Sequence, residues 1–161
     1  MTRPGGTCIR NRPFQCPGAS GPEGRITPLL AITTKSPYAV RALCELARRG
    51  GSVPIPISEI AGRREIPVQF LESLFGTLRR AGILQSQRGA KGGYSFARPP
   101  EEVTVLEVVE LLEGGLDVAA EPSGPIWQEA VEALRGVLGA VTIAEAAERE
   151  AGAEAAPMYY I

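Results

Sequence analysis

Residues 57–97 contain the pattern that most limits what this chain can fold into. Ser58 is expected to cap a short helix that ends near Arg64, and Pro67 is expected to open a second helix. In the second helix, apolar residues recur at i, i+3, i+4 and i+7, so one face is expected to be buried. This face consists of Leu71, Leu74, Phe75 and Leu78. Two short helices joined by a tight turn predict a helix-turn-helix.

A β-hairpin is expected directly after these helices. The segments Ile83–Arg88 and Tyr94–Ala97 are strand-like and flank a glycine-rich connection at 89–93. One interpretation of the connection is a mobile loop. The other depends on Arg88 and Lys91, because an arginine on a thin hairpin suits a narrow, electronegative minor groove. The order of helix, turn, helix and basic hairpin favours a DNA-binding wing.

Helices are also expected on both sides of this unit. The first is capped by Thr34 or Ser36 and ends at Gly50-Gly51, and the proline-rich stretch 53–57 suits only a short edge strand. Thr104 is expected to cap a later helix that stops at Gly114-Gly115. The last helix is expected from Thr142 to about Ala151.

A long apolar stripe follows residue 125. It consists of Trp127, Ala130, Val131, Leu134, Val137, Leu138 and Val141. One interpretation is packing against the chain's own first helix, and the other is pairing with a second copy. We favour a homodimer, because proteins that read operators commonly double their contacts through two-fold symmetry. The expected dimer interface is Trp127, Val131, Leu134 and Leu138.

Charge divides the chain into a basic part and an acidic part. Residues 33–98 hold 11 Lys/Arg and 4 Glu, a sum of +7, whereas residues 99–161 hold 2 Arg and 13 acids, a sum of −11. Chance segregation is the alternative, but the pattern favours a first half that meets a polyanion.

The composition excludes several classes of site. The chain has no histidine, which removes histidine-based catalysis and histidine metal ligands. Three cysteines are too few for a disulfide scaffold, and no apolar run is long enough for a membrane helix. We therefore expect a cytoplasmic protein with no enzyme activity, no metal, no cofactor and no membrane association.

The predicted fold class is mostly α with a small β-hairpin wing: a winged helix-turn-helix domain plus a long dimerisation helix. Residues 1–31 are expected to be a disordered extension, or a segment that is not translated if synthesis begins near Leu29 or Leu30. The DNA-binding domain is expected at 32–100, the helical linker and dimerisation region at 101–150, and a flexible tail at 151–161.

Five segments together resemble the Rrf-type family of bacterial winged helix-turn-helix transcriptional regulators, which includes the IscR, NsrR and CymR types. They are ITTKSPYAVRAL at 32–43, ISEIA at 57–61, FLE at 70–72, LRRAGIL at 78–84 and RGAKGGY at 88–94. The match covers about Ile32 to Ala147. The resemblance implies a sequence-specific DNA-binding regulator that acts as a repressor.

The resemblance also implies roles for single residues. Gln69, Glu72 and Ser73 take the base-reading positions of the recognition helix, and Arg88 takes the position of the wing residue that enters the minor groove. The implied phosphate contacts are Thr33, Lys35, Arg79, Arg80 and Lys91. This division suits their chemistry, because polar side chains read base edges and cations supply salt-dependent affinity.

The chain departs from the sensory members of that family in its cysteines. Those members carry three cysteines between the helix after the wing and the dimer helix, but residues 114–125 have none. The resemblance therefore implies a cluster-free, CymR-like member. A relocated site of Cys8, Cys16 and Cys44 is the alternative. The Cys8–Cys16 spacing matches no common metal motif, and Cys44 lies among apolar helix positions.

A different class of function is also open to such a chain. A winged-helix dimer can bind a regulatory partner protein without retaining operator binding. The basic wing, with Arg88 and Lys91, favours DNA binding over this alternative.

Overall fold

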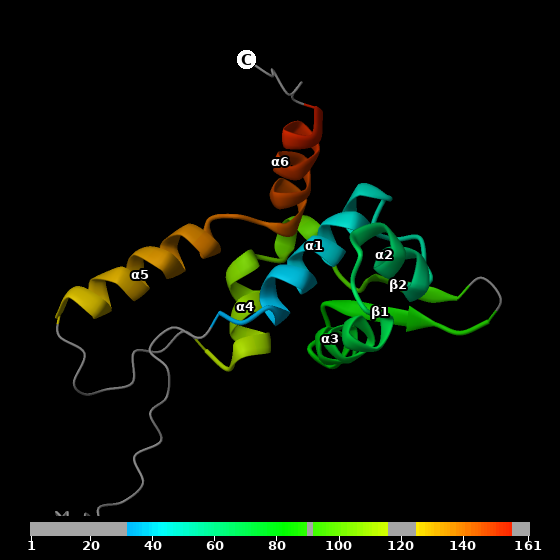
Figure 1. Cartoon of the computed structure of the whole chain (residues 1–161), viewed down its shortest axis with the longest axis horizontal. Helices are drawn as coiled ribbons and strands as arrows, with labels where there is room; N and C mark the ends of the chain where they lie inside the picture. Colours follow the sequence, from blue (N-terminus) through cyan, green and yellow to red (C-terminus); the bar gives the residue numbers. More distant parts are fainter. Residues whose placement is uncertain (1–31, 90–91, 116–124, 156–161) are drawn as a thin grey trace, which may run out of the picture.

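The computed structural model describes residues 32–89, 92–115 and 125–155 (Figure 1). Within them lie α1 (Lys35–Arg48), α2 (Ile57–Arg64), α3 (Val68–Arg80), β1 (Leu84–Gln87), β2 (Gly93–Phe96), the 3-10 helix η1 (Pro100–Glu102), α4 (Val105–Glu113), α5 (Pro125–Gly139) and α6 (Ile143–Ala155). The fold is mostly α with one antiparallel hairpin, which confirms the predicted fold class. In the described residues, no helix has the length and apolar character needed to cross a membrane.

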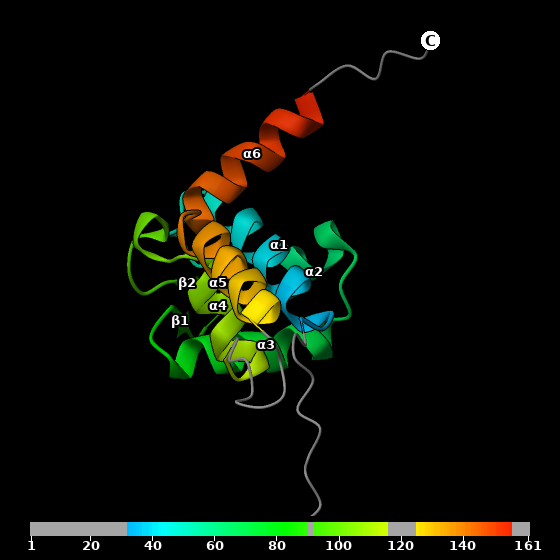
Figure 2. The ribbon, with the colours of Figure 1, turned by 90° about the vertical axis from the view of Figure 1, so that its left-hand side faces the viewer.

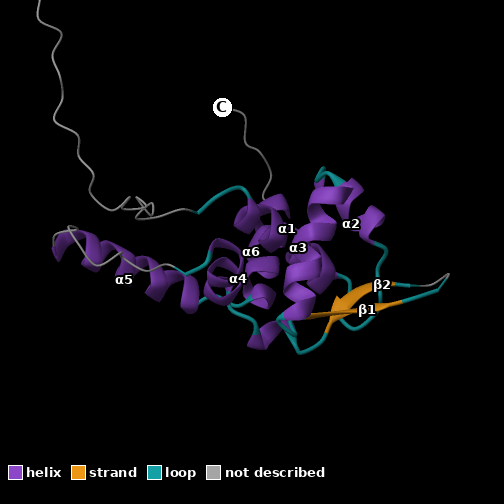
Figure 3. Ribbon diagram, turned by 90° about the horizontal axis from the view of Figure 1, so that it is seen from below, coloured by secondary structure: helices purple, strands orange, loops and turns teal. Residues whose placement is uncertain are grey.

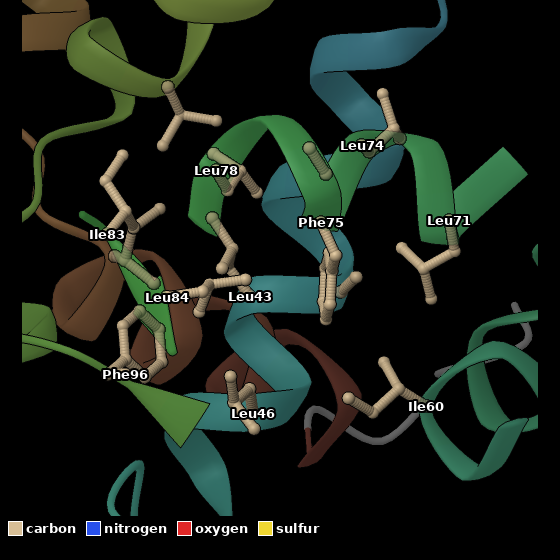
Figure 4. Close-up of a cluster of buried hydrophobic side chains, with 14 of the residues drawn as sticks. Leu43, Leu46, Ile60, Leu71, Leu74, Phe75, Leu78, Ile83, Leu84 and Phe96 are labelled. Atoms are coloured by element: carbon tan, nitrogen blue, oxygen red, sulfur yellow. The ribbon is translucent and has the colours of Figure 1, made fainter. Parts of the chain in front are cut away.

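One core joins α1, α2, α3 and the hairpin (Figure 4). The apolar positions predicted in α3 are all buried, and they pack against residues of α1 such as Leu43 and Leu46. Ile83, Leu84 and Phe96 close the core from the hairpin side. Burial of large apolar side chains is the main favourable contribution to such a fold.

The first helix of the helix-turn-helix begins earlier than predicted, directly after a proline. The α2 helix begins at Ile57, with Pro56 as its N-cap, so Ser58 lies inside the first turn. The Pro56 carbonyl accepts a hydrogen bond from the backbone N–H of Glu59 at 3.0 Å. The expected edge strand at 53–57 is reduced to one bridge between Ile55 and Tyr94. Pro54 and Pro56 have no N–H, so they cannot extend this ladder.

The C-terminal helices pack on two different parts of the domain. The α5 helix lies on α4, and α6 lies along α1. Figures 1 and 2 show α6 on the side of α1 opposite α3, and Figure 3 shows α5 projecting from the domain. Thr142 caps α6, as its hydroxyl accepts from the Glu145 N–H at 3.2 Å. The helix continues to Ala155, beyond its predicted end near Ala151.

Candidate nucleic-acid interface

The solvent face of α3 carries the three predicted base-reading residues. Gln69, Glu72 and Ser73 are all exposed, whereas Leu71 and Leu74 on the opposite face are buried. The spacing of 69, 72 and 73 is i, i+3 and i+4, so the three side chains lie next to one another on the helix. Their amide, carboxylate and hydroxyl groups can hydrogen-bond base edges.

The wing is held beside α3 by contacts at its base. Leu84 pairs with Phe96 and Gln87 pairs with Gly93 in the antiparallel ladder. The Tyr94 ring packs edge-on against Phe75 of α3, with ring centroids 5.2 Å apart. The Tyr94 N–H also donates to the Ile55 carbonyl at 2.8 Å. The hairpin therefore has a defined position relative to α3 (Figures 1 and 3).

Arg88 directly follows β1 and is exposed. Lys91, the other predicted wing cation, lies outside the described residues. An exposed guanidinium at this position can reach into a groove or contact phosphates, because its five donors are rigid and always charged.

Two further residues predicted to contact phosphates, Arg79 and Arg80, lie at the C-terminal end of α3. Arg79 donates from Nη1 to Ser86 Oγ at 3.2 Å, which links α3 to β1. Arg80 donates from Nη2 to Thr77 Oγ1 at 3.1 Å, and both arginines are exposed. Their charges also stabilise the C-terminal end of the α3 dipole.

The start of α1 holds two predicted phosphate contacts, Thr33 and Lys35. It also contacts Glu113, which the sequence analysis did not identify. Lys35 is exposed, while Thr33 donates from its N–H and its hydroxyl to Glu113 Oε1, each at 3.0 Å. Ser36 Oγ donates to the same oxygen at 2.7 Å. Burial acts to raise the pKa of Glu113, but these hydrogen bonds outweigh it and lower the pKa. No local sequence signal identified Glu113, because its partners lie 77 and 80 residues away.

The predicted dimer residues divide between two environments. Val131 is only 4% exposed within the single chain, because it packs against Val109 of α4, and Leu134 and Leu138 are half-buried beside it. Trp127 is 52% exposed. The solvent side of α5 carries a different apolar stripe at i, i+4, i+7 and i+11: Ile126, Ala130, Ala133 and Val137. Val131 is therefore used in folding the chain itself rather than being available at its surface.

Thiol chemistry is restricted at Cys44. The side chain is fully buried, and desolvation followed by the Glu150 charge raises its pKa to about 12. Cys8 and Cys16 lie outside the described residues. No group of three or more His, Cys, Asp or Glu that could hold a metal occurs in the part of the chain that the structure describes.

Comparison with protein families adds an independent observation. The model of the Rrf2 family, which is described as an iron-dependent transcriptional regulator, matches residues 32–149. The regulator CymR of Bacillus subtilis is 31% identical over 138 residues, covering 82% of this chain and 100% of CymR. An HTH-type regulator of Synechocystis is 41% identical over 88 residues, covering 55% of this chain and 60% of that relative.

Solved structures show the same similarity. T. potens IscR superposes with a TM-score of 0.68 and 34% identity, covering 81% of this chain and 97% of that one. The structure of B. subtilis CymR, the global cysteine regulator, superposes with a TM-score of 0.69 and 29% identity. That superposition covers 74% of this chain and 98% of CymR.

Proposed function

Since this chain belongs to the Rrf2 family of DNA-binding transcriptional regulators, we propose that it is a sequence-specific repressor that binds double-stranded operator DNA as a homodimer and without an iron–sulfur cluster. The observation that carries this proposal is the juxtaposition of the polar α3 face and the wing with Arg88.

Base reading is assigned to Gln69, Glu72 and Ser73. Gln69 can pair with adenine, Glu72 can accept from cytosine N4, and Ser73 can hydrogen-bond either type of base edge. Their exposure on a helix whose other face is buried supports this assignment. The exposed cations Lys35, Arg79 and Arg80 are suited to phosphates on either side of the helix. Lys91 is also proposed as a phosphate contact, and Thr33 could be one only if it exchanged its hydrogen bonds to Glu113 for a phosphate oxygen.

Homodimer formation is assigned to α5. Ile126 and Val137 are 67% and 64% exposed, and with Trp127 they leave an apolar surface on a helix that projects from the domain (Figure 1). Pairing with a second copy would remove this surface from water. The proposed interface therefore centres on Trp127 and the Ile126–Val137 stripe, with Leu134 and Leu138 at its edge.

The absence of a cluster is inferred from the available ligands. Residues 114–125 contain no cysteine, and the raised pKa of the buried Cys44 thiol disfavours the thiolate that iron requires. The residues on this segment therefore do not fit an iron–sulfur cluster. Protein purified without oxygen should contain no stoichiometric iron or acid-labile sulfide. One cluster's equivalent of iron and sulfide per chain would contradict this part of the proposal.

In vitro selection from a random duplex library tests sequence-specific binding. The wild-type protein should enrich one motif with two-fold symmetry. Gln69→Ala should relax the preference at one base pair of each half-site, by about 1–3 kcal/mol. The same selected motif for both proteins would remove Gln69 from base reading.

A gel shift on the protein's own promoter distinguishes operator binding from a role as a partner-binding module. Retarded promoter DNA, resistant to excess unrelated duplex, supports the proposal. A dimer that retards no duplex and instead binds a regulatory partner protein would support the alternative function.

A further inference from the structure

A basic surface pocket lies on the α1 and α2 helices, away from the α3 face. This arginine pocket is lined by Arg41, Glu45, Arg48, Arg49, Arg63 and Arg64 and has a volume of about 550 Å³. On α1, the pocket residues lie opposite the apolar positions such as Leu43 that face the core. Figures 1 and 2 show α3 below α1 and α6 above it. The DNA-reading helix therefore does not line this pocket.

The pocket contains much of the positive charge of the basic half of the chain. Five of the 11 Lys/Arg between residues 33 and 98 line it, whereas α3 and the described part of the wing carry Arg79, Arg80 and Arg88. Only one lining residue, Glu45, is acidic, so the lining has a net charge of +4 (five arginines and one glutamate). The basic charge of residues 33–98 is thus not explained by the DNA interface alone.

Glu45 lines the pocket and forms ion pairs with three of its arginines. Its carboxylate lies 3.4 Å from Arg49, 3.7 Å from Arg63 and 3.2 Å from Arg64. Glu59 adds a second ion pair to Arg49 at 2.6 Å but does not line the pocket. Arg41 is exposed and makes no ion pair within the described ranges. A carboxylate shared by three guanidinium groups leaves donors for a further anion.

Arg64 connects the pocket to α6. Its side chain is 9% exposed, and Nε donates to Glu45 Oε2 at 3.2 Å. Its Nη2 lies 2.9 Å from Glu150 Oε2 of α6, and both atoms are buried, so an ion pair joins Arg64 to that helix. A buried guanidinium is unfavourable unless it keeps an anionic partner. An anion in the pocket that displaced Glu150 would take over this role.

We propose that the arginine pocket binds a small polyanion with phosphate or carboxylate groups. Guanidinium groups match both anions in bidentate geometry, and the volume lies in the range typical of small-molecule sites. Because Glu150 belongs to α6, an anion that binds Arg64 replaces a contact between α6 and the helix-turn-helix. The ligand would thereby change the packing of α6 without contacting the DNA-reading face of α3.

Isothermal titration of the full-length protein with pyrophosphate, and separately with citrate, tests the pocket in low-salt buffer free of other polyanions. Binding of either probe at one site per chain is expected. Arg41→Gln combined with Arg63→Gln should weaken that binding by about tenfold or more. The Arg63 side chain is 54% exposed, and Arg41 is also exposed. The fold should therefore persist in the double variant. Circular dichroism checks the fold of the variant.

Arg80→Gln is the matched control, since it removes one cation outside the pocket. It should leave the pyrophosphate and citrate affinities unchanged and weaken DNA binding, whereas the double variant should leave the salt dependence of DNA binding unchanged. No heat of binding with either probe, or equal affinity in the wild type and the double variant, would overturn the proposal. A flatter salt dependence of DNA binding in the double variant would also overturn it, because the arginines would then contact DNA phosphates.

Discussion

At the scale of single residues, Glu113 shows how distant parts of the chain are joined by one carboxylate. It accepts hydrogen bonds from Thr33 and Ser36, so the end of α4 holds the start of α1. The carboxylate satisfies backbone and hydroxyl donors at a helix N-terminus, where negative charge is favourable. The helix that precedes residues 114–125 is thereby connected to the proposed phosphate contacts Thr33 and Lys35.

Glu113→Gln should reduce the dependence of stability on acidic pH. The folded pKa of Glu113 lies below its ordinary value of 4.5, so its stabilisation is present above pH 4.5 and is lost as the pH falls through the folded value. At pH 7 the substitution should lower the free energy of unfolding by about 1 kcal/mol, allowing for solvent screening. Urea unfolding at pH 7, 4 and 3 measures the difference. A difference that stays constant across this range would contradict the role of the ionised carboxylate.

At the scale of elements, the wing depends on close backbone approach at Gly93. A Cβ at this residue would overlap the Ile55 carbonyl and lie 2.7 Å from Pro56 N. This crowding exists because the Ile55–Tyr94 bridge brings the segment before α2 directly onto β2. A glycine is therefore required where the hairpin meets the helix-turn-helix.

Gly93→Ala should destabilise the protein by about 1–3 kcal/mol, because backbone atoms must move to admit the methyl group. Gly62→Ala is the matched control, since its Cβ meets nothing within 4 Å and it lies inside α2. The control should gain about 0.5–1 kcal/mol from helix propensity. Thermal unfolding of both variants measures these changes. Equal stability of Gly93→Ala and the wild type would show that the wing does not rely on this approach.

Local sequence patterns predicted the helices and strands better than they predicted which elements pack together. The periodicity of Leu71, Leu74 and Phe75 predicted α3 and its buried face, because burial follows directly from helical spacing. The apolar stripe of α5 was also evident, yet its packing on Val109 depends on where α4 lies after folding. The N-cap of α2 is Pro56, two residues before the predicted Ser58, although serine is the better N-cap by its local chemistry. Glu113 gave no signal, because only the tertiary fold brings it to Thr33.

At the scale of the whole molecule, three surfaces differ from one another in charge and polarity. The α3 face and wing are polar and basic, α5 is apolar on its solvent side, and the arginine pocket lies on neither. Each surface thus suits a different kind of partner: DNA, a second copy and a small anion.

Val137→Glu should weaken the proposed homodimer, because a charge would be placed in the apolar stripe of α5. The dimer dissociation constant should rise by at least about tenfold. Glu132→Gln changes an exposed residue on the opposite side of the same helix and should have no such effect. Sedimentation velocity over a range of concentrations measures both variants. A wild-type protein that is monomeric throughout, or a Val137→Glu dimer of unchanged affinity, would contradict an α5 interface.

We infer that α3 and the wing hold double-stranded DNA, and the salt dependence of operator binding checks this inference. Fluorescence anisotropy on the selected duplex, at several salt concentrations, gives the slope of log K against log salt for the wild type, Arg88→Ala and the Arg41→Gln control. Arg88→Ala should bind more weakly and reduce the magnitude of the slope by about one, while the control follows the wild type. Identical affinities and slopes for the wild type and Arg88→Ala would contradict the claim.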